Sequence, residues 1–233
     1  MVVSVKNLYN LLLDTFGHQQ WWPVDTNYHQ NHQSDPRFEI IIGAILTQNT
    51  AWTNVEKALE NLKKQHIFTL QAMTQVEEKT LRSLIQPSGF FNQKTLRLKF
   101  FASYLEKKYG GDLAEFFTQD KYESRHELLS LSGIGPETAD SMLLYAGNHP
   151  VFVVDAYTRR ICQRLPLSVQ GGSYDEIQRF FEKELSLSFP KKEQVSVYKE
   201  FHALLVQLAK QYCRKKNPSC SDCPLNQLCE KLL

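Results

Sequence analysis

The chain has 233 residues, of which 42% are hydrophobic and 22% are charged, and its formal net charge is +2. This length and composition suffice for one sizeable core or two smaller ones and exclude wholesale disorder. No segment reaches the roughly 20 consecutive apolar residues that cross a membrane, and the first residues lack the charge and apolar order of a signal peptide. We therefore expect a soluble, cytoplasmic protein, and the small net charge leaves DNA binding open.

Helical periodicity marks the first part of the sequence. Leu8, Leu12 and Phe16 fall on one face of an expected first helix. A loop rich in Gln, Asn, His and Pro follows over residues 17–37. Residues 38–47 are nearly all apolar and have strand propensity, but the helical segments on both sides favour a buried helix.

Polar start signals and glycine stops predict the later helices. Three capping boxes pair an N-cap hydroxyl with a carboxylate three residues further on. The pairs are Thr74 with Glu77, Ser124 with Glu127, and Ser173 with Glu176. Residues 96–109 are expected to form a helix that ends at Gly110. Residues 151–154 are a short apolar run that we expect to be extended, and residues 195–212 are expected to form a last long helix. The sum is an all-α protein of about ten helices.

Four of the five cysteines lie close together near the C-terminus, which in a cytoplasmic chain favours a metal site over disulfides. They are Cys213, Cys220, Cys223 and Cys229, in the pattern C-x6-C-x2-C-x5-C. Thiolates at this spacing can converge on one metal centre, and they suit both zinc and iron–sulfur clusters. Zinc sites more often use two short C-x2-C pairs, and here there is one. Cys162 stands alone and is expected to be a small core residue.

A basic loop separates the first two of these cysteines and contains Lys215 and Lys216. Held in place by a metal centre, such a loop could bind DNA phosphates. It could equally be a solvated charged loop, and the residues leave both alternatives open.

The most informative segment is Leu-Ser-Gly-Ile-Gly-Pro-Glu-Thr-Ala, residues 131–139. Gly133 and Gly135 predict a tight turn between two helices, and Pro136 is suited to open the second helix. The backbone N–H groups of such a hairpin can bind a phosphate without reading the base sequence, and Thr138 belongs to the same expected DNA contact. The alternative is an ordinary helix end followed by a turn.

Asp155 follows the apolar run 151–154 and precedes an expected helix. An acidic residue in this position most often serves as an N-cap. Its place shortly after the hairpin favours a catalytic role.

Taken together, these features resemble the endonuclease III branch of the helix-hairpin-helix DNA glycosylase superfamily, over nearly the whole chain. The resemblance implies an all-α fold of two domains with a DNA-binding cleft between them. Residues 38–148 would form a six-helix barrel domain with the hairpin, and residues 1–37 and 149–233 a discontinuous iron–sulfur cluster domain. It also implies a [4Fe–4S] cluster on the four cysteines and assigns the essential aspartate to Asp155.

Two further segments carry the resemblance. The run around Gln48, residues 45–50, is similar to the family helix whose glutamine fills the gap left by an extruded base, and residues 89–94 look like the loop that supplies a wedge, here Phe90. One position departs from the bifunctional members, which carry a lysine two residues after the second hairpin glycine. Here that residue is Glu137, and a carboxylate cannot form the Schiff base needed for strand cleavage. The resemblance therefore implies a monofunctional enzyme.

A subgroup of 3-methyladenine DNA glycosylases is similar in more detail. The shared segments are Trp21-Trp22-Pro23, Phe38-Glu39, residues 46–50, Pro87-Ser88-Gly89-Phe90, the hairpin with Glu137, and Phe201-His202. In that subgroup the positions of Trp21, Trp22, Pro23 and Trp52 line the base pocket. Its members lack the cluster cysteines, which this chain carries.

We therefore expect a monomeric enzyme that removes alkylated purines, above all 3-methyladenine, from duplex DNA. Indole faces attract a cationic alkylated base, and base flipping would deliver it between them. Two alternatives stay open: an endonuclease III-like glycosylase that acts on oxidised pyrimidines with another lysine as its lyase residue, and a non-catalytic DNA-binding protein.

Overall fold

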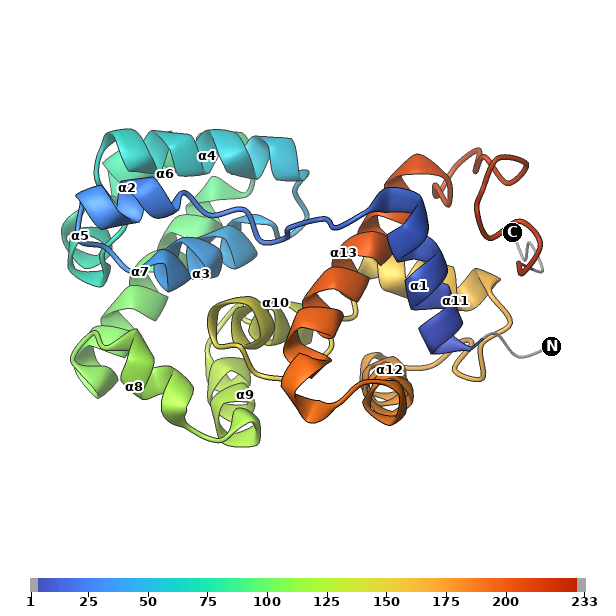
Figure 1. Cartoon of the computed structure of the whole chain (residues 1–233). Helices are drawn as coiled ribbons and strands as arrows, with labels where there is room; N and C mark the ends of the chain where they lie inside the picture. The colour runs from blue at the N-terminus through green and yellow to red at the C-terminus, as the bar shows by residue number, and fades with distance from the viewer. Residues whose placement is uncertain (1–3, 230–233) are drawn as a thin grey trace. The chain divides into compact units, whose positions relative to one another are not determined.

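The computed structural model describes residues 4–229, and within that range the chain is helical and contains no strand (Figure 1). The α-helices are α1 (Val5–Phe16), α2 (Thr26–Asn31), α3 (Pro36–Leu46), α4 (Trp52–Lys64), α5 (Leu70–Gln75), α6 (Glu78–Ile85), α7 (Phe91–Tyr109), α8 (Leu113–Thr118), α9 (Lys121–Ser130), α10 (Pro136–Ser141), α11 (Ala156–Arg164), α12 (Tyr174–Ser188) and α13 (Gln194–Gln211). Two short 3-10 turns are η1 (Gln86–Ser88) and η3 (Lys191–Glu193), and η2 (Met142–Ala146) is a π-helical turn. The all-α prediction is confirmed. No helix in residues 4–229 is both long enough and apolar enough to cross a membrane.

The chain folds as two compact units. One contains Trp22–Asn148, and the other contains the described parts of 1–21 and 149–233. The expected boundary after residue 37 therefore needs correction, because residues 22–37 belong with the unit that follows them. Their helix α2 is anchored there through His29, whose Nε2 lies 2.7 Å from Oε2 of the buried Glu39 in α3.

The unit Trp22–Asn148 is built around α3 and α7. Every residue of α3 from Phe38 to Leu46 is buried, which explains why this segment is almost uniformly apolar. The long helix α7 packs against α3, α5, α6 and α8. It begins at Phe91, five residues before the predicted start, and ends as predicted at Gly110, which adopts a left-handed conformation with φ 57°.

In the other unit α13 packs against α1, α11 and α12 (Figure 1). Its buried Phe201 contacts the rings of Phe152 and Phe181, with centroid distances of 6.0 and 5.6 Å. These aromatic contacts place α13 and the segment 151–154 in one core.

Residues 151–154 form an extended run that joins no sheet, although each of them is buried. Side chains of α12 take over the hydrogen bonds that a neighbouring strand would make. The N–H of Phe152 donates to Glu182 Oε1 at 2.9 Å, and its carbonyl accepts from Gln178 Nε2 at 2.7 Å. Because buried backbone polar groups need partners, α12 holds this run in place and thereby positions the residue that follows it, Asp155.

Two of the three expected capping boxes are wrong. Thr74 lies in the last turns of α5, where its hydroxyl donates to the carbonyl of Gln71. Ser124 is buried inside α9, because Asp120 stands four residues earlier and caps the helix itself. The box that begins at Ser173 is confirmed, with both of its reciprocal hydrogen bonds present.

Candidate functional site

Asp155 is the N-cap of α11, and its side chain is buried. Oδ1 accepts a hydrogen bond of 2.7 Å from the backbone N–H of Thr158. Oδ2 lies 3.4 Å from Nε2 of His202, a buried residue of α13. The capping interpretation of Asp155 is thus confirmed, and it leaves the second carboxylate oxygen facing an imidazole rather than the helix.

The surroundings of Asp155 keep it ionised. Burial by itself would raise the pKa of this carboxyl, but the imidazole of His202 and the N–H of Thr158 more than offset it, so the pKa lies below its usual value. At neutral pH the residue is therefore a desolvated carboxylate. Such a group can stabilise a positive charge or accept a proton from water.

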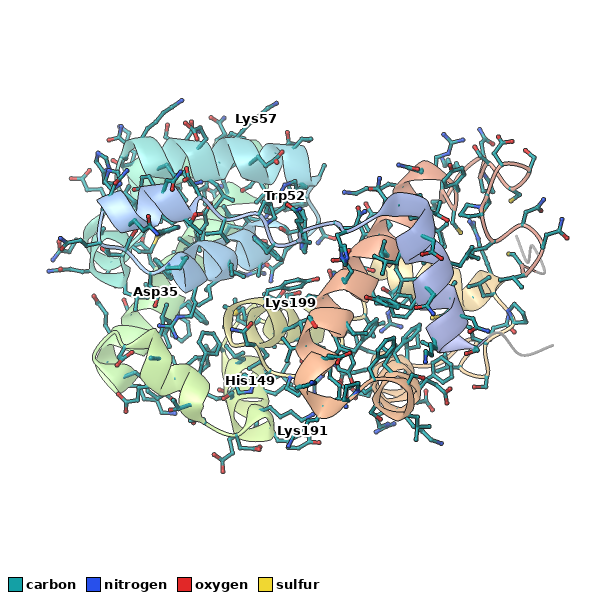
Figure 2. The ribbon with its side chains drawn as sticks, viewed as in Figure 1. Asp35, Trp52, Lys57, His149, Lys191 and Lys199 are labelled. Carbon is teal, nitrogen blue, oxygen red and sulfur yellow. The ribbon has the colours of Figure 1, made fainter. Side chains whose placement is uncertain are left out.

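Residue Trp22 anchors an aromatic cluster in the unit Trp22–Asn148. Its ring contacts Trp52 at the start of α4 (Figure 2) and Tyr145 of η2, each with centroids 5.3 Å apart. The ring also lies against Gly43 of α3, where a Cβ atom would come within 2.8 Å of it. Gly43 thus leaves the space that Trp22 occupies. Tyr145 was not identified from the sequence, because a buried tyrosine in an apolar run looks like ordinary core.

The contact between Trp22 and Trp52 changes the expectation that a flipped base would enter between the indole rings. The two rings meet edge to face at an interplanar angle of 89°, so a flipped base has no room between them as they lie. A base would have to stack on an outer face of the cluster. Pro23 is exposed at the start of this unit, and Trp21 ends the preceding segment, half-buried in the other unit.

Both the NH₂ group and the carbonyl oxygen of the Gln48 side chain make hydrogen bonds. Nε2 donates to the carbonyl of Gly133 and to Oγ1 of Thr138, each at 2.9 Å. Oε1 accepts from Nη1 of Arg97 in α7 at 2.5 Å. Thr138 is buried, so its hydroxyl serves here to hold Gln48. Arg97 was missed at the sequence level, since nothing local links α7 to a hairpin more than thirty residues away.

The two hairpin positions carry glycine for different physical reasons. Gly133 has φ +84°, and a Cβ there would come within 2.2 Å of Arg97 Nε, so both its conformation and its close contact exclude a side chain. Gly135 has φ −93°, and a Cβ there would meet nothing within 4 Å. The fold itself does not require glycine at position 135. Glu137 lies exposed in the first turn of α10, where a carboxylate complements the helix dipole.

Phe90 stands in an unusual conformation. It follows Gly89 and precedes α7 with φ 45°, a left-handed geometry that is costly for an aromatic residue, and its side chain is 62% exposed. Strained and exposed apolar residues of this kind concentrate at binding sites. The expectation that this residue projects from its loop is consistent with that geometry.

The cysteines Cys213, Cys220, Cys223 and Cys229 line one cavity, together with Arg164, Tyr212 and Asn226. Among residues 4–229, no three His, Cys, Asp or Glu side chains converge closely enough to hold a single metal ion. The four thiols around one cavity form an all-thiolate donor set, which is the kind that iron–sulfur clusters use. Cys162 is fully buried away from them, and burial raises its pKa to about 12, as expected for an inert core thiol.

Helix α11 connects this cavity to Asp155. The helix begins after Asp155, and in its middle Arg160 Nε donates to the carbonyl of Cys213 at 2.7 Å. Arg164 Nη1 lies 3.3 Å from Cys213 Sγ, and the Cys229 thiol lies 3.2 Å from the Arg164 carbonyl. The cysteine loop is therefore tied to the helix that Asp155 caps. Lys215 and Lys216 are exposed in that loop.

A helical fold with a glycine hairpin and a buried aspartate at a helix start defines the class of DNA-binding repair proteins that the sequence motifs resemble. The comparisons agree. Residues 42–186 match the family described as "HhH-GPD superfamily base excision DNA repair protein". The chain belongs to this superfamily and is a DNA glycosylase of base excision repair.

Among relatives, the chain is 43% identical over 226 residues to the "Putative DNA repair glycosylase MJ1434" of Methanocaldococcus jannaschii, covering 97% of this chain and 95% of that one. It is 29% identical to an endonuclease III of Thermotoga maritima, with 86% of each chain covered. Among solved structures, it is similar to the H. pylori 3-methyladenine DNA glycosylase MagIII bound to 1,N6-ethenoadenine, with a TM-score of 0.70, 27% identity, and coverage of 90% of this chain and 98% of that one.

Proposed function

We propose that this glycosylase is monofunctional and hydrolyses the N-glycosidic bond of alkylated purines, above all 3-methyladenine, in duplex DNA. The observation that carries the proposal is Asp155, a buried carboxylate with a lowered pKa and one oxygen left over from helix capping. Departure of a purine leaves an oxocarbenium-like sugar, which a desolvated carboxylate stabilises while it orients or deprotonates the attacking water.

His202 is proposed as the residue that positions Asp155. Its Nε2, 3.4 Å from Asp155 Oδ2, keeps the carboxylate charged despite burial. The sequence alone assigns no role to the pair Phe201–His202, because His202 in α13 is distant along the chain from Asp155 at the start of α11.

The monofunctional character rests on Glu137. Strand cleavage requires an amine that attacks C1′ and forms a Schiff base, and this residue offers a carboxylate at the hairpin position where bifunctional relatives carry lysine. The hairpin is proposed to bind a DNA phosphate. Gly135, whose missing side chain the fold does not explain, would leave the backbone open to that phosphate.

The choice of substrate rests on the aromatic cluster of Trp22, Trp52 and Tyr145 and on the similarity to a 3-methyladenine glycosylase. Alkylation gives the purine a positive charge, which weakens the glycosidic bond and draws the base to an electron-rich ring face. Such a base leaves without strong acid catalysis, so an aromatic surface and one carboxylate suffice.

We further propose that Cys213, Cys220, Cys223 and Cys229 hold a [4Fe–4S] cluster and that the protein acts as a monomer. The support is the shared cavity and the all-thiolate donor set. When bound, the cluster would supply a cross-link of the C-terminal loop. Arg160 and Arg164, which contact Cys213, would fix the cross-linked loop to α11. The exposed Lys215 and Lys216 of that loop would then bind DNA phosphates. Iron and sulfide analysis of the purified protein tests this assignment, and stoichiometric zinc would overturn it.

The substrate is tested by excision kinetics on duplexes that each contain one lesion. We expect release of 3-methyladenine and 1,N6-ethenoadenine, an intact abasic strand, and no covalent adduct after borohydride treatment. Excision of thymine glycol without excision of methylated purines would reject the substrate assignment. A borohydride-trapped adduct would reject the monofunctional assignment. Tight DNA binding with no excision of any lesion would favour a non-catalytic role.

A second candidate, an endonuclease III-like glycosylase and lyase, is favoured by the similarity to the Thermotoga enzyme and by one residue. Lys199 lies on α13 one turn before His202 (Figure 2), and burial lowers its pKa, which is what a nucleophilic amine needs. If borohydride traps an adduct, Lys199→Met should abolish it.

A further inference from the structure

Lys94 is a buried lysine in the first turn of α7. Its side chain is 1% exposed, and lysine is among the residues least often found inside proteins. Its ammonium donates three hydrogen bonds of 2.7 Å each, to the Leu46 carbonyl, to Oγ1 of Thr50 and to the Ser88 carbonyl. All three donors are thus used, and all three acceptors are neutral oxygens.

These acceptors belong to two different turns. Leu46 and Thr50 flank the turn after α3 that contains Gln48, and Ser88 lies two residues before Phe90. The hydroxyl of Thr50 also contacts the Ser88 carbonyl directly. One ammonium therefore fixes the distance between the turn that carries Gln48 and the turn that carries Phe90.

One helical turn further on, Arg97 extends the same arrangement to a third segment. It donates to Gln48 Oε1 and packs against the backbone of Gly133 in the hairpin. Lys94 and Arg97 thus connect both turns and the hairpin to one face of α7. The members of this group are Leu46, Gln48, Thr50, Ser88, Phe90 and Gly133.

We propose that Lys94 is a positioning residue for base extrusion, which holds Gln48 and Phe90 at a fixed separation as a rigid probe of the duplex. Extruding a base costs unstacking energy, which proteins recover by inserting side chains into the stack. An exposed phenylalanine on a turn can do this only if the turn does not yield. The inference rests on the proposed function, since it assumes that an extruded base is the substrate.

The test compares Lys94→Met with Lys99→Met. Lys99 lies on the same helix and donates to three carbonyls at the end of α5, those of Met73, Thr74 and Val76, away from both turns. Both changes remove one ammonium with three acceptors, so both should lower the melting temperature. We expect Lys94→Met to reduce single-turnover excision from duplex DNA by at least about tenfold, which is what the loss of a charge-assisted hydrogen bond costs. Lys99→Met should stay within about threefold of the wild type, as a substitution distant from the site does.

Extrusion is measured separately. A 2-aminopurine next to the lesion should show a smaller fluorescence rise with Lys94→Met than with Lys99→Met. A lesion placed in an unpaired bubble needs little extrusion, so there Lys94→Met should recover most of its activity. A purely structural or chemical defect would not recover in this way.

If Lys94→Met does not fold, Thr50→Val removes one acceptor with little change in shape and should give the same pattern with a smaller loss. Equal excision by the Lys94 and Lys99 variants, or an equal defect on paired and unpaired lesions, would overturn the inference. Failure of the proposed substrate is distinguishable, because then the wild type itself releases no alkylated purine from either DNA.

Discussion

Asp155 in one unit and Lys94 in the other are both buried charged side chains, and the two are held in opposite ways. Asp155 faces an imidazole and a backbone N–H, and its pKa is lowered despite burial. Lys94 faces neutral oxygens, and burial together with the nearby charge of Arg97 lowers its pKa to about 8. The environment therefore favours the charged form of the aspartate and disfavours the charged form of the lysine.

The difference fits the role proposed for each residue. A carboxylate that stabilises a cationic sugar must stay charged throughout the working pH range. A lysine that holds two turns together needs hydrogen-bond donors, and its charge is a cost of burial. An imidazole and a backbone N–H are accordingly found beside Asp155, and carbonyl and hydroxyl oxygens are found around Lys94.

Asp155→Asn should give the largest effect. Asparagine caps a helix as well as aspartate does, so the melting temperature and DNA binding should change little. The charge is lost, and excision should fall by roughly a thousandfold or more. Single-turnover kinetics with saturating enzyme measure this. If the variant turned over as fast as the wild type, Asp155 would have no catalytic role, and its comparison with Lys94 would say nothing about catalysis.

His202→Gln should come next. Without the imidazole, burial dominates and the pKa of Asp155 rises. In the wild type this carboxyl is protonated only below its usual range, so excision should persist to low pH. In the variant the acid limb should move toward neutral pH, with a loss of roughly ten- to a hundredfold at pH 7, the range of one supporting residue. A pH–rate profile of both proteins checks this, and an unmoved acid limb would contradict the positioning role.

Deprotonation of the Lys94 ammonium should produce an alkaline limb in the pH–rate profile of excision. Above a pH of about 8 it loses a proton in the folded protein, and one of its three hydrogen bonds goes with it. The charged group facing it is Arg97, and its acceptors from the 46–50 turn and η1 are neutral. Excision from duplex DNA should therefore fall several-fold between pH 7.5 and pH 9.5, in the range of one weakened hydrogen bond.

The contribution of Lys94 to stability should rise with pH, whereas the excision rate falls. Between pH 8 and the ordinary lysine pKa of 10.5 the unfolded chain binds more protons than the folded one. The contribution of this group to the free energy of unfolding then rises with pH. Lys94→Met should lack both effects and Lys99→Met should keep both. A flat excision rate over this range would contradict the prediction.

The hairpin should show the smallest effects and separate folding from binding. Gly133→Ala places a methyl group on a left-handed backbone and against Arg97. It should therefore destabilise the protein by about 1–2 kcal/mol or more. Gly135→Ala should change stability by less than about 0.5 kcal/mol, as surface substitutions do. It should still weaken binding to undamaged duplex DNA. Thermal melts and fluorescence anisotropy measure the two quantities, and unchanged DNA affinity for Gly135→Ala would argue against a phosphate at this position.

The features that the sequence predicted well are those encoded within a few residues. The apolar run of α3, the capping box at Ser173, the convergence of the four cysteines on one cavity and the capping position of Asp155 all depend on local spacing. The failures have a local cause too. At Ser124 a better cap, Asp120, lies one turn upstream. The boundary after residue 37 was implied by the resemblance alone, because no local signal in the polar segment 22–37 marks a domain boundary.

The sequence by itself determined an all-helical protein with a glycine hairpin, a C-terminal cysteine cluster and an acidic helix start, because periodicity and short spacings specify these features. Only the tertiary structure decided that His202 faces Asp155, that Trp22 meets Tyr145, and that Lys94 joins two turns. Each of these contacts brings together segments from different elements. Whether a histidine or lysine is buried depends on the partners that the fold supplies, and no pattern along the chain records those partners.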